Sequence, residues 1–194
     1  LREGVLHQPS GVELENQNLG IVGFGASGRE LAFRAKAFGM KIEVNDVVAP
    51  TPEAVEHYGV SFAGGPEKLD EMLPRVDYLS VHLPLNEETH HIIDARRLGL
   101  MKKSACLINV ARGELVDEEE LVAALSEGRL AGAGLDVFSQ EPLPVDSPLL
   151  DLPNVVLLPH VSGSTDGTAR RRAALAAENC DRVAAGLELL HRVA

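Results

Sequence analysis

Apolar runs of strand length alternate with helical patterns along this chain. Seven such runs predict strands, at 19–24, 41–45, 60–62, 78–81, 105–110, 132–137 and 155–158. Most are rich in Val, Ile and Leu, which is typical of strands that are covered on both faces of a parallel sheet. The alternation therefore predicts an α/β fold, a doubly wound parallel sheet of about seven strands with helices on both faces.

Helical patterns fall between the predicted strands, at 27–38, 52–58, 117–126 and 166–190. In the first of them the apolar residues share one stripe, namely Leu31, Ala32, Ala35 and Phe38. The last is rich in Ala and predicts one long helix, which Gly186 could bend. The Pro-rich segment 141–153 predicts an ordered loop, because Pro does not continue a helix.

Composition narrows the classes of partner. The 18 Lys and Arg against 29 Asp and Glu give a formal net charge of −11, which repels nucleic acids and anionic membranes. We therefore expect neither as a partner. Cys106 lies in an apolar run and suits a buried thiol in a reducing compartment, so a cytoplasmic location is expected. The chain opens without Met, as a fragment of a longer protein would.

A glycine-rich turn follows the first predicted strand and opens the first helix. Its spacing is Gly23, Gly25 and Gly28, the dinucleotide-binding fingerprint in its required context. Gly23 would make the tight turn, Gly25 would admit the pyrophosphate, and Gly28 would let the helix pack closely on the strand. The backbone amides of Ala26 and Ser27 would then face the phosphates. This predicts a Rossmann-type nucleotide site.

Asp46 ends the second predicted strand. A carboxylate there can accept both ribose hydroxyls of the adenosine half, whereas a 2′-phosphate would be repelled. Val47 and Val48 follow, with no Arg beside Asp46 to compensate. The residue predicts NAD as cofactor, with an Asp that merely ends a strand as the alternative.

Three further segments match, in order, the motifs of the D-isomer-specific 2-hydroxyacid dehydrogenases, so that nearly the whole chain resembles the NAD-binding domain of this family. They are 81–85 (VHLPL), 108–113 (INVARG), and 134–138 (GLDVF) leading through 141–142 (EP) to 158–160 (LPH). The resemblance implies reversible reduction of a 2-keto acid to a D-2-hydroxy acid. No metal is needed for this chemistry.

The resemblance also implies a catalytic set. Arg112 would bind the substrate carboxylate and polarise its carbonyl, a task for a planar, permanently charged donor. His160 would be the general acid/base, and Glu141 would hold its other ring nitrogen and favour the imidazolium. A solvated Arg, a capped loop His and a solvated Glu are the commoner roles of these residue types.

Other positions would contact the cofactor by the same resemblance. Asp136 would bind the nicotinamide carboxamide, and four residues would line the ring, namely Val110, Ala111, Ser162 and Gly163. Leu83 and Pro84 would lie near the adenosine site. For His82, which precedes Leu83 in the same motif, a role in cofactor binding and a structural role are equal alternatives. Four other histidines, His57, His90, His91 and His191, are expected to be exposed.

We expect three parts in the chain: 1–17 connecting from a substrate domain that is absent, 18–165 forming the nucleotide-binding domain, and 166–194 a C-terminal helix returning toward the substrate domain. Substrate identity stays open among glyoxylate, hydroxypyruvate, 3-phosphoglycerate and bulkier 2-keto acids. The family also implies a homodimer. Whether residues 1–194 are active without the substrate domain is left open.

Two alternatives remain, one from another class and one a different enzyme. A non-enzymatic NAD(H)-sensing protein, such as the corepressors that resemble this family, would keep the same residues. Formate dehydrogenase shares the fold but pairs its His with a Gln, so Glu141 argues against it. Gln140 facing His160 would reverse that judgement.

Overall fold

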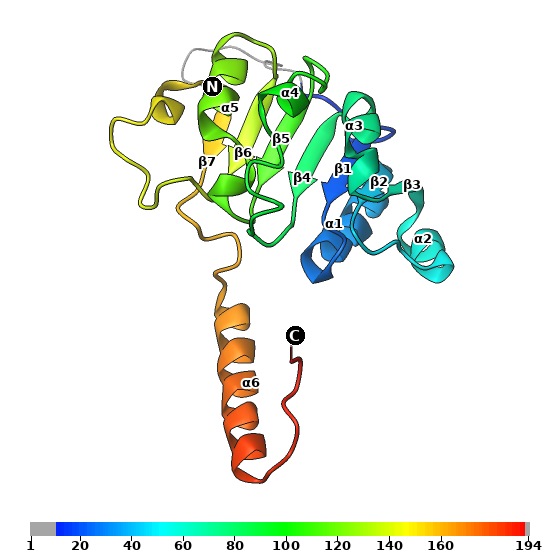
Figure 1. Cartoon of the computed structure of the whole chain (residues 1–194), viewed down its shortest axis with the longest axis vertical. Helices are drawn as coiled ribbons and strands as arrows, with labels where there is room; N and C mark the ends of the chain where they lie inside the picture. Colours follow the sequence, from blue (N-terminus) through cyan, green and yellow to red (C-terminus); the bar gives the residue numbers. More distant parts are fainter. Residues whose placement is uncertain (1–10, 193–194) are drawn as a thin grey trace, which may run out of the picture. The chain divides into compact units, whose positions relative to one another are not determined.

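The structure, a computed structural model, describes residues 11–192, and the chain forms two compact units that divide between Pro159 and His160. The first unit contains one parallel sheet of seven strands, ordered β3-β2-β1-β4-β5-β6-β7 (Figure 1). The strands are β1 (Asn18–Val22), β2 (Lys41–Asn45), β3 (Val60–Gly64), β4 (Tyr78–Val81), β5 (Cys106–Asn109), β6 (Gly132–Leu135) and β7 (Val155–Leu157). The predicted fold class is confirmed.

The strand order reverses between β1 and β4. Loops that leave the carboxyl ends of these two strands diverge at that point, and open α/β sheets bind their ligands there. Four predicted strands extend too far at this end, at Phe24, Val110, residues 136–137 and Leu158. Those residues have left the sheet to form the loops of its rim.

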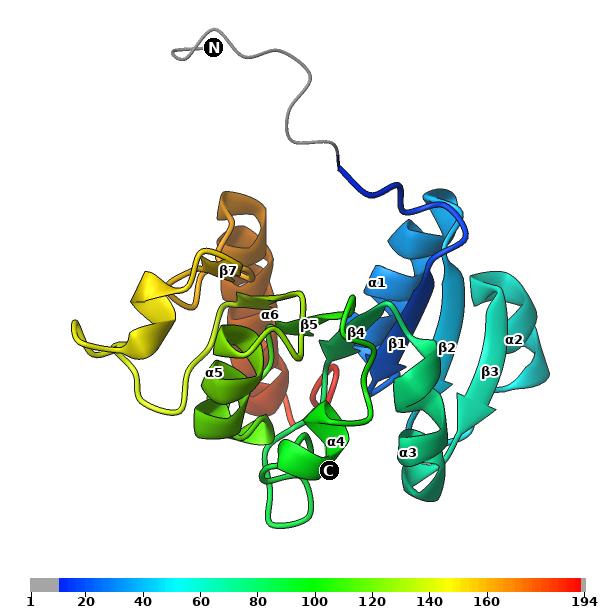
Figure 2. The same ribbon diagram turned by 90° about the horizontal axis from the view of Figure 1, so that it is seen from above.

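Among residues 11–192, five α-helices belong to the first unit and one to the second. They are α1 (Ala26–Ala37), α2 (Pro52–Tyr58), α3 (Leu69–Met72), α4 (Ala95–Leu98), α5 (Glu118–Ser126) and, in the second unit, α6 (Asp166–Ala184). Figure 2 shows α1 on one side of the sheet and α3, α4 and α5 on the other. The sequence does not predict α3 and α4, because four residues are too few to show a helical period. None of the helices among residues 11–192 is long and apolar enough to cross a membrane.

Two apolar clusters fill the two faces of the sheet. Ala32 and Ala35 of α1 pack on Ile21, Ile42 and Val44. The larger cluster joins α3, α4 and α5 to the opposite face; among its members are Leu69, Met72, Leu98, Leu121, Leu79, Leu107 and Leu135. Burial of apolar surface in both layers holds the strand ends in place, and with them the loops of the rim.

The observed helices differ from the predicted ones in two features. Phe38, which shares the predicted apolar stripe, is 63% exposed, because α1 ends at Ala37 and Gly39 then turns the chain at φ +75°. The long C-terminal helix ends at Ala184 rather than bending. Gly186 adopts φ +69°, and the amide of Leu187 donates to the carbonyl of Arg182, which is the Schellman ending that glycine favours.

The Pro-rich segment is a loop with one exception. Pro148–Asp151 forms a 3₁₀ turn, and the Ser147 hydroxyl caps it by accepting from the amide of Leu149. Pro is compatible with the first position of such a turn because the amide it lacks would have no partner there.

Glu43 is a charged residue inside the sheet, with only 4% of its side chain exposed. Arg75 Nε lies 3.2 Å from both carboxylate oxygens and donates to Oε1, while Oε2 accepts no hydrogen bond within the described residues. Burial raises the pKa of Glu43, and Arg75 opposes this by less. The more distant Lys102 lowers the same pKa, and Asp77 raises it.

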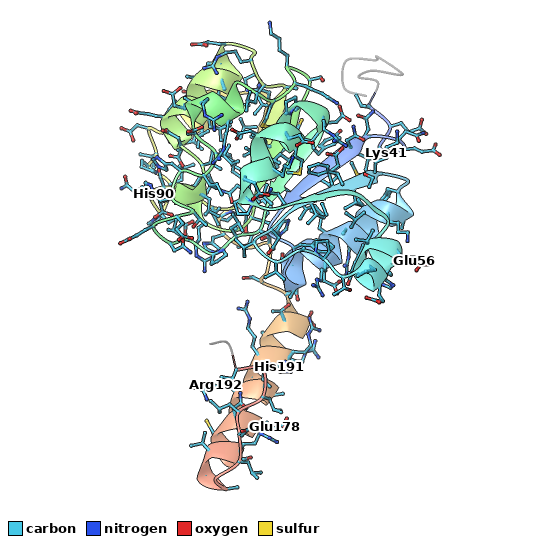
Figure 3. The ribbon with its side chains drawn as sticks, turned by 45° about the vertical axis from the view of Figure 1, so that its right-hand side comes forward. Lys41, Glu56, His90, Glu178, His191 and Arg192 are labelled. Atoms are coloured by element: carbon cyan, nitrogen blue, oxygen red, sulfur yellow. The ribbon has the colours of Figure 1, made fainter. Side chains whose placement is uncertain are left out.

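Replacing Glu43 by Gln is therefore expected to stabilise the fold near neutral pH. A raised pKa in the folded state means that ionisation costs stability as the pH rises from the usual carboxyl range. The free energy of unfolding, measured with urea across pH, should be higher for Glu43→Gln than for the parent at neutral pH and equal to it in acid. Glu56→Gln is the matched control, since Glu56 is exposed on α2 and points away from the sheet (Figure 3). A Glu43→Gln protein less stable than the parent at neutral pH would refute this.

Candidate functional site

The glycine-rich turn between β1 and α1 has no room for side chains at two of its three glycines. Gly23 adopts φ +98°, and a Cβ there would lie 2.8 Å from the His82 carbonyl group. A Cβ on Gly28 would lie 2.1 Å from the Gly23 oxygen. At Gly25, by contrast, an added Cβ meets nothing within 4 Å, and the residue is exposed. The turn thus packs tightly against backbone at Gly23 and Gly28 and has open space at Gly25. That space fits the approach of a pyrophosphate.

The N-terminus of α1 is suited to an anion. Side chains cap α2, α4, α5 and α6, through Thr51, Asp94, Asp117 and Thr165. In α1 the N-cap is Gly25, which has no side chain, and no acidic residue lies in the first turn. Ala26 and Ser27, the first residues of the helix, are exposed. Their amides therefore face solvent at the positive end of the helix dipole.

Asp46 connects the glycine-rich turn to the loop after β2. Its Oδ2 accepts from the amide of Phe24 at 2.5 Å, and its Oδ1 accepts from the amide of Val48 at 2.8 Å. Each carboxylate oxygen has about two acceptor positions, so the group can still accept from ribose hydroxyls. A 2′-phosphate would meet the same negative charge.

His82 connects the start of α1 to β4. Its Nδ1 lies 2.9 Å from Ser27 Oγ, and its Nε2 lies 2.9 Å from Ser80 Oγ. Burial lowers the pKa of the ring, which favours neutral imidazole. These contacts let His82 orient the Ser27 hydroxyl, and a role in cofactor binding stays a prediction.

A cleft of about 400 Å³ opens at the carboxyl ends of β4 and β5. It is lined by Ser27, His82, Leu83, Pro84, Leu85, Val110, Ala111 and Arg112. Six of these are residues that the sequence predicts as site residues, and they come from three separate motifs. The sequence does not single out Leu85, which is exposed beside Pro84.

The turn that carries Arg112 is held from both sides. Asn109 is 1% exposed; its Nδ2 donates to the Arg112 carbonyl at 2.7 Å, and its Oδ1 accepts from the Ala111 amide at 3.1 Å. A Cβ on Gly113 would lie 1.9 Å from the Phe138 carbonyl carbon. Arg112 itself is exposed, with Nη1 donating to the Ala111 carbonyl at 2.6 Å. The sequence does not predict Asn109 as a site residue, and its one signal is a polar residue at the end of an apolar strand.

Asp136 and Glu141 lie on the loop after β6, outside the lining of the cleft. Asp136 is 2% exposed, and its amide donates to the Asn109 carbonyl at 3.0 Å. Glu141 is exposed, and its Oε1 accepts from the Phe138 amide at 3.1 Å. The loop that carries Glu141 is therefore the loop on which Gly113 packs.

His160, Ser162 and Gly163 belong to the second unit, and their roles stay predictions. His160 has a left-handed backbone, with φ +54°. Residues other than glycine are uncommon in this region, and such strain often accompanies functional sites.

Three of the other histidines are exposed as predicted, namely His57, His90 and His191, of which the last two are labelled in Figure 3. His91 is half-buried instead, and its Nδ1 lies 3.6 Å from Asp117 Oδ2.

Comparison with known proteins identifies relatives over most of the chain. Glyoxylate/hydroxypyruvate reductase B of Citrobacter koseri is 47% identical over 87% of this chain and 51% of its own length. Glyoxylate reductase of Korarchaeum cryptofilum is 44% identical over 87% of this chain and 49% of its own. The chain thus spans about half the length of these curated relatives.

Among solved structures, a D-isomer specific 2-hydroxyacid dehydrogenase of Xanthobacter autotrophicus Py2, in complex with NADPH and MES, superposes with a TM-score of 0.86. It is 35% identical, over 100% of this chain and 77% of that one. A family model, "D-isomer specific 2-hydroxyacid dehydrogenase, NAD binding domain", matches residues 1–162. The chain therefore belongs to this family and contains its NAD-binding domain.

Proposed function

We propose that this protein is an NAD-dependent oxidoreductase that interconverts a D-2-hydroxy acid and its 2-keto acid. The observation that carries the proposal is the cleft in which Arg112 lies with Ser27, beside the open face of the glycine-rich turn. A permanent positive charge at the rim of a nucleotide-binding sheet suits a small carboxylate substrate. The names of the relatives favour this enzyme over a non-enzymatic NAD(H)-sensing protein.

The cofactor would be held at the rim of the sheet in the first unit. The amides of Ala26 and Ser27 would bind the pyrophosphate, and Asp46 the adenosine ribose. By family resemblance, Leu83 and Pro84 would lie near the adenosine site, and five residues would lie along the nicotinamide half, namely Val110, Ala111, Asp136, Ser162 and Gly163. Bound NAD(H) exchanges a hydride with the carbonyl carbon of the substrate, and the protein contributes geometry and charge.

Arg112 would bind the substrate through its carboxylate and polarise the neighbouring carbonyl. The hydrogen bonds of Asn109 and the close packing of Gly113 fix the backbone from which this guanidinium extends. We propose a short 2-keto acid as substrate, of the size of glyoxylate or hydroxypyruvate, which the curated relatives are named for.

His160 would transfer the proton. In reduction the imidazolium donates to the carbonyl oxygen, and in oxidation the neutral ring accepts from the hydroxyl. Glu141 would accept from the other ring nitrogen and stabilise the imidazolium that donates the proton. Reduction should then weaken in base, because the proton donor is lost.

We also propose that the protein works in the cytoplasm as a homodimer. The family resemblance supports the dimer. The exposed thiol of Cys180 and the partly buried thiol of Cys106 suit a reducing compartment.

The chain of residues 1–194 should bind NADH more tightly than NADPH. Asp46→Asn keeps one acceptor oxygen but loses the charge, so we expect NADH affinity to fall roughly tenfold and the preference over NADPH to narrow. Titration of NADH fluorescence measures both, with Asp151→Asn, an exposed acid on the 3₁₀ turn, as control. No binding at millimolar NADH, or tighter binding of NADPH, would count against the proposed site.

In the full-length protein, His160→Ala should lower kcat for 2-keto acid reduction by about 10²–10⁴-fold, the usual contribution of general acid catalysis. Arg112→Ala should lower kcat/KM, and Arg112→Lys should restore little of it because Lys lacks the planar donor pair. Steady-state kinetics with NADH and a panel of 2-keto acids tests this. Arg129→Ala is the control, because Arg129 contacts Glu127 at the surface. Unchanged turnover in the His160 and Arg112 variants would overturn the mechanism.

The homodimer is tested by light scattering of the full-length protein after size-exclusion chromatography. We expect twice the chain mass at all micromolar concentrations, since a stable interface resists dilution. A single-chain mass throughout would exclude the dimer.

A further inference from the structure

The loop that carries Glu141 is fixed by a carboxylate from a different element. Glu118 is the first residue of α5 and is half-buried. Its Oε2 accepts from the amide of Ser139 at 2.9 Å, and its Oε1 accepts from the Ser139 hydroxyl at 2.9 Å. Both carboxylate oxygens are thus used on one residue, two positions before Glu141. Hydrogen bonds to an ionised acceptor are the stronger ones.

The helix behind this contact is firmly anchored. Leu121, Ala124 and Leu125 of α5 are each at most 3% exposed and belong to the larger apolar cluster. The Asp117 side chain caps the helix through the amide of Glu120. Glu118 therefore extends from a rigid element, whereas Ser139 and Glu141 lie on an exposed loop. Through this contact, the anchored helix restrains the position of the loop.

The same loop contacts the turn of Arg112. The Cβ that Gly113 lacks would lie 2.4 Å from the Ser139 nitrogen, besides its clash with Phe138. The next amide back, that of Phe138, donates to Glu141 Oε1. Two consecutive amides are thus bound by two carboxylates, one from the helix and one from the loop itself. This sets where the Glu141 side chain lies.

We propose that Glu118 is a positioning residue for Glu141, and that the Glu118–Ser139 contact holds the Glu141 loop in place against the Arg112 turn. The inference rests on the proposed role of Glu141 as the partner of the catalytic imidazole. Glu118 contacts neither substrate nor cofactor and acts through the backbone of residues 138–141. Its loss should therefore reproduce part of the effect of losing Glu141, while cofactor binding is retained.

Amide hydrogen exchange of the chain tests the contact itself. Glu118→Ala should speed exchange at Ser139 by about tenfold or more, since a charge-assisted hydrogen bond is removed. Glu119→Ala is the matched control, an acid in the same helical turn that is exposed. It removes the same negative charge from the first turn of α5 and should leave exchange at Ser139 unchanged. Equal exchange at Ser139 in the parent and Glu118→Ala would overturn the proposal.

The pH dependence of kcat/KM for reduction by the full-length protein tests the consequence. Glu141→Gln should move the basic limb to lower pH, and Glu118→Ala should move it the same way by less, with NADH affinity unchanged. Ser139→Ala, at an exposed position, removes one of the two bonds and should give a smaller shift; it tests the contact even where Glu118→Ala does not fold. Glu118→Gln retains one acceptor oxygen, so its kcat/KM profile should lie between those of Glu118→Ala and the parent.

The two levels of the proposal fail differently. If the basic limb of the kcat/KM profile moves in Glu141→Gln but stays in place in both Glu118→Ala and Ser139→Ala, the positioning role is refuted and the proposed reaction stays intact. A limb that stays in place in Glu141→Gln as well would refute the role of Glu141 on which it rests. A fall in NADH affinity equal to the fall in kcat/KM would show a general loss of structure instead of positioning, and would also refute it.

Discussion

The rim of the sheet depends on backbone segments that approach each other more closely than a side chain allows. Gly23 lies against the His82 carbonyl, Gly28 against the Gly23 carbonyl, and Gly113 against Phe138. The first contact joins the loop after β1 to the loop after β4, the second joins α1 to the loop before it, and the third joins the loop after β5 to the loop after β6. A methyl group at any of the three positions would push two elements apart, because the neighbouring atoms are backbone and have little freedom to move.

Polar side chains complete what these glycine contacts begin. Asp46 binds the glycine-rich turn, Asn109 binds the Arg112 turn, and Glu118 binds the loop of Glu141. Each one satisfies backbone groups that leave regular secondary structure at the edge of the sheet and would otherwise lack partners. The apolar clusters fix the strands, and these hydrogen bonds fix where each loop lies relative to its strand. Ligand binding and catalysis at such an edge need both the packed strands and the fixed loops.

The sequence predicts the sheet well because its inner strands are mostly buried and appear as largely apolar runs, while the edge strands β3 and β7 are partly exposed. It also predicts most of the residues that line the cleft, since they belong to motifs with defined spacing. It does not predict the Glu118–Ser139 contact, which joins residues on separate elements through polar groups that carry no periodicity. The exposure of Phe38 and the end of α6 at Ala184 depend on where a helix stops, and a stripe of apolar residues does not fix that point.

The central claim is that the glycine-rich turn and the cleft beside it form one cofactor site. Amide chemical shifts of the isotopically labelled chain, recorded with and without NAD, test it most directly. We expect shifts at Ala26 and Ser27, at the amides of Phe24 and Val48 that Asp46 holds, and along residues 110–112. Shifts confined to other faces of the sheet, or none at saturating NAD, would contradict the account.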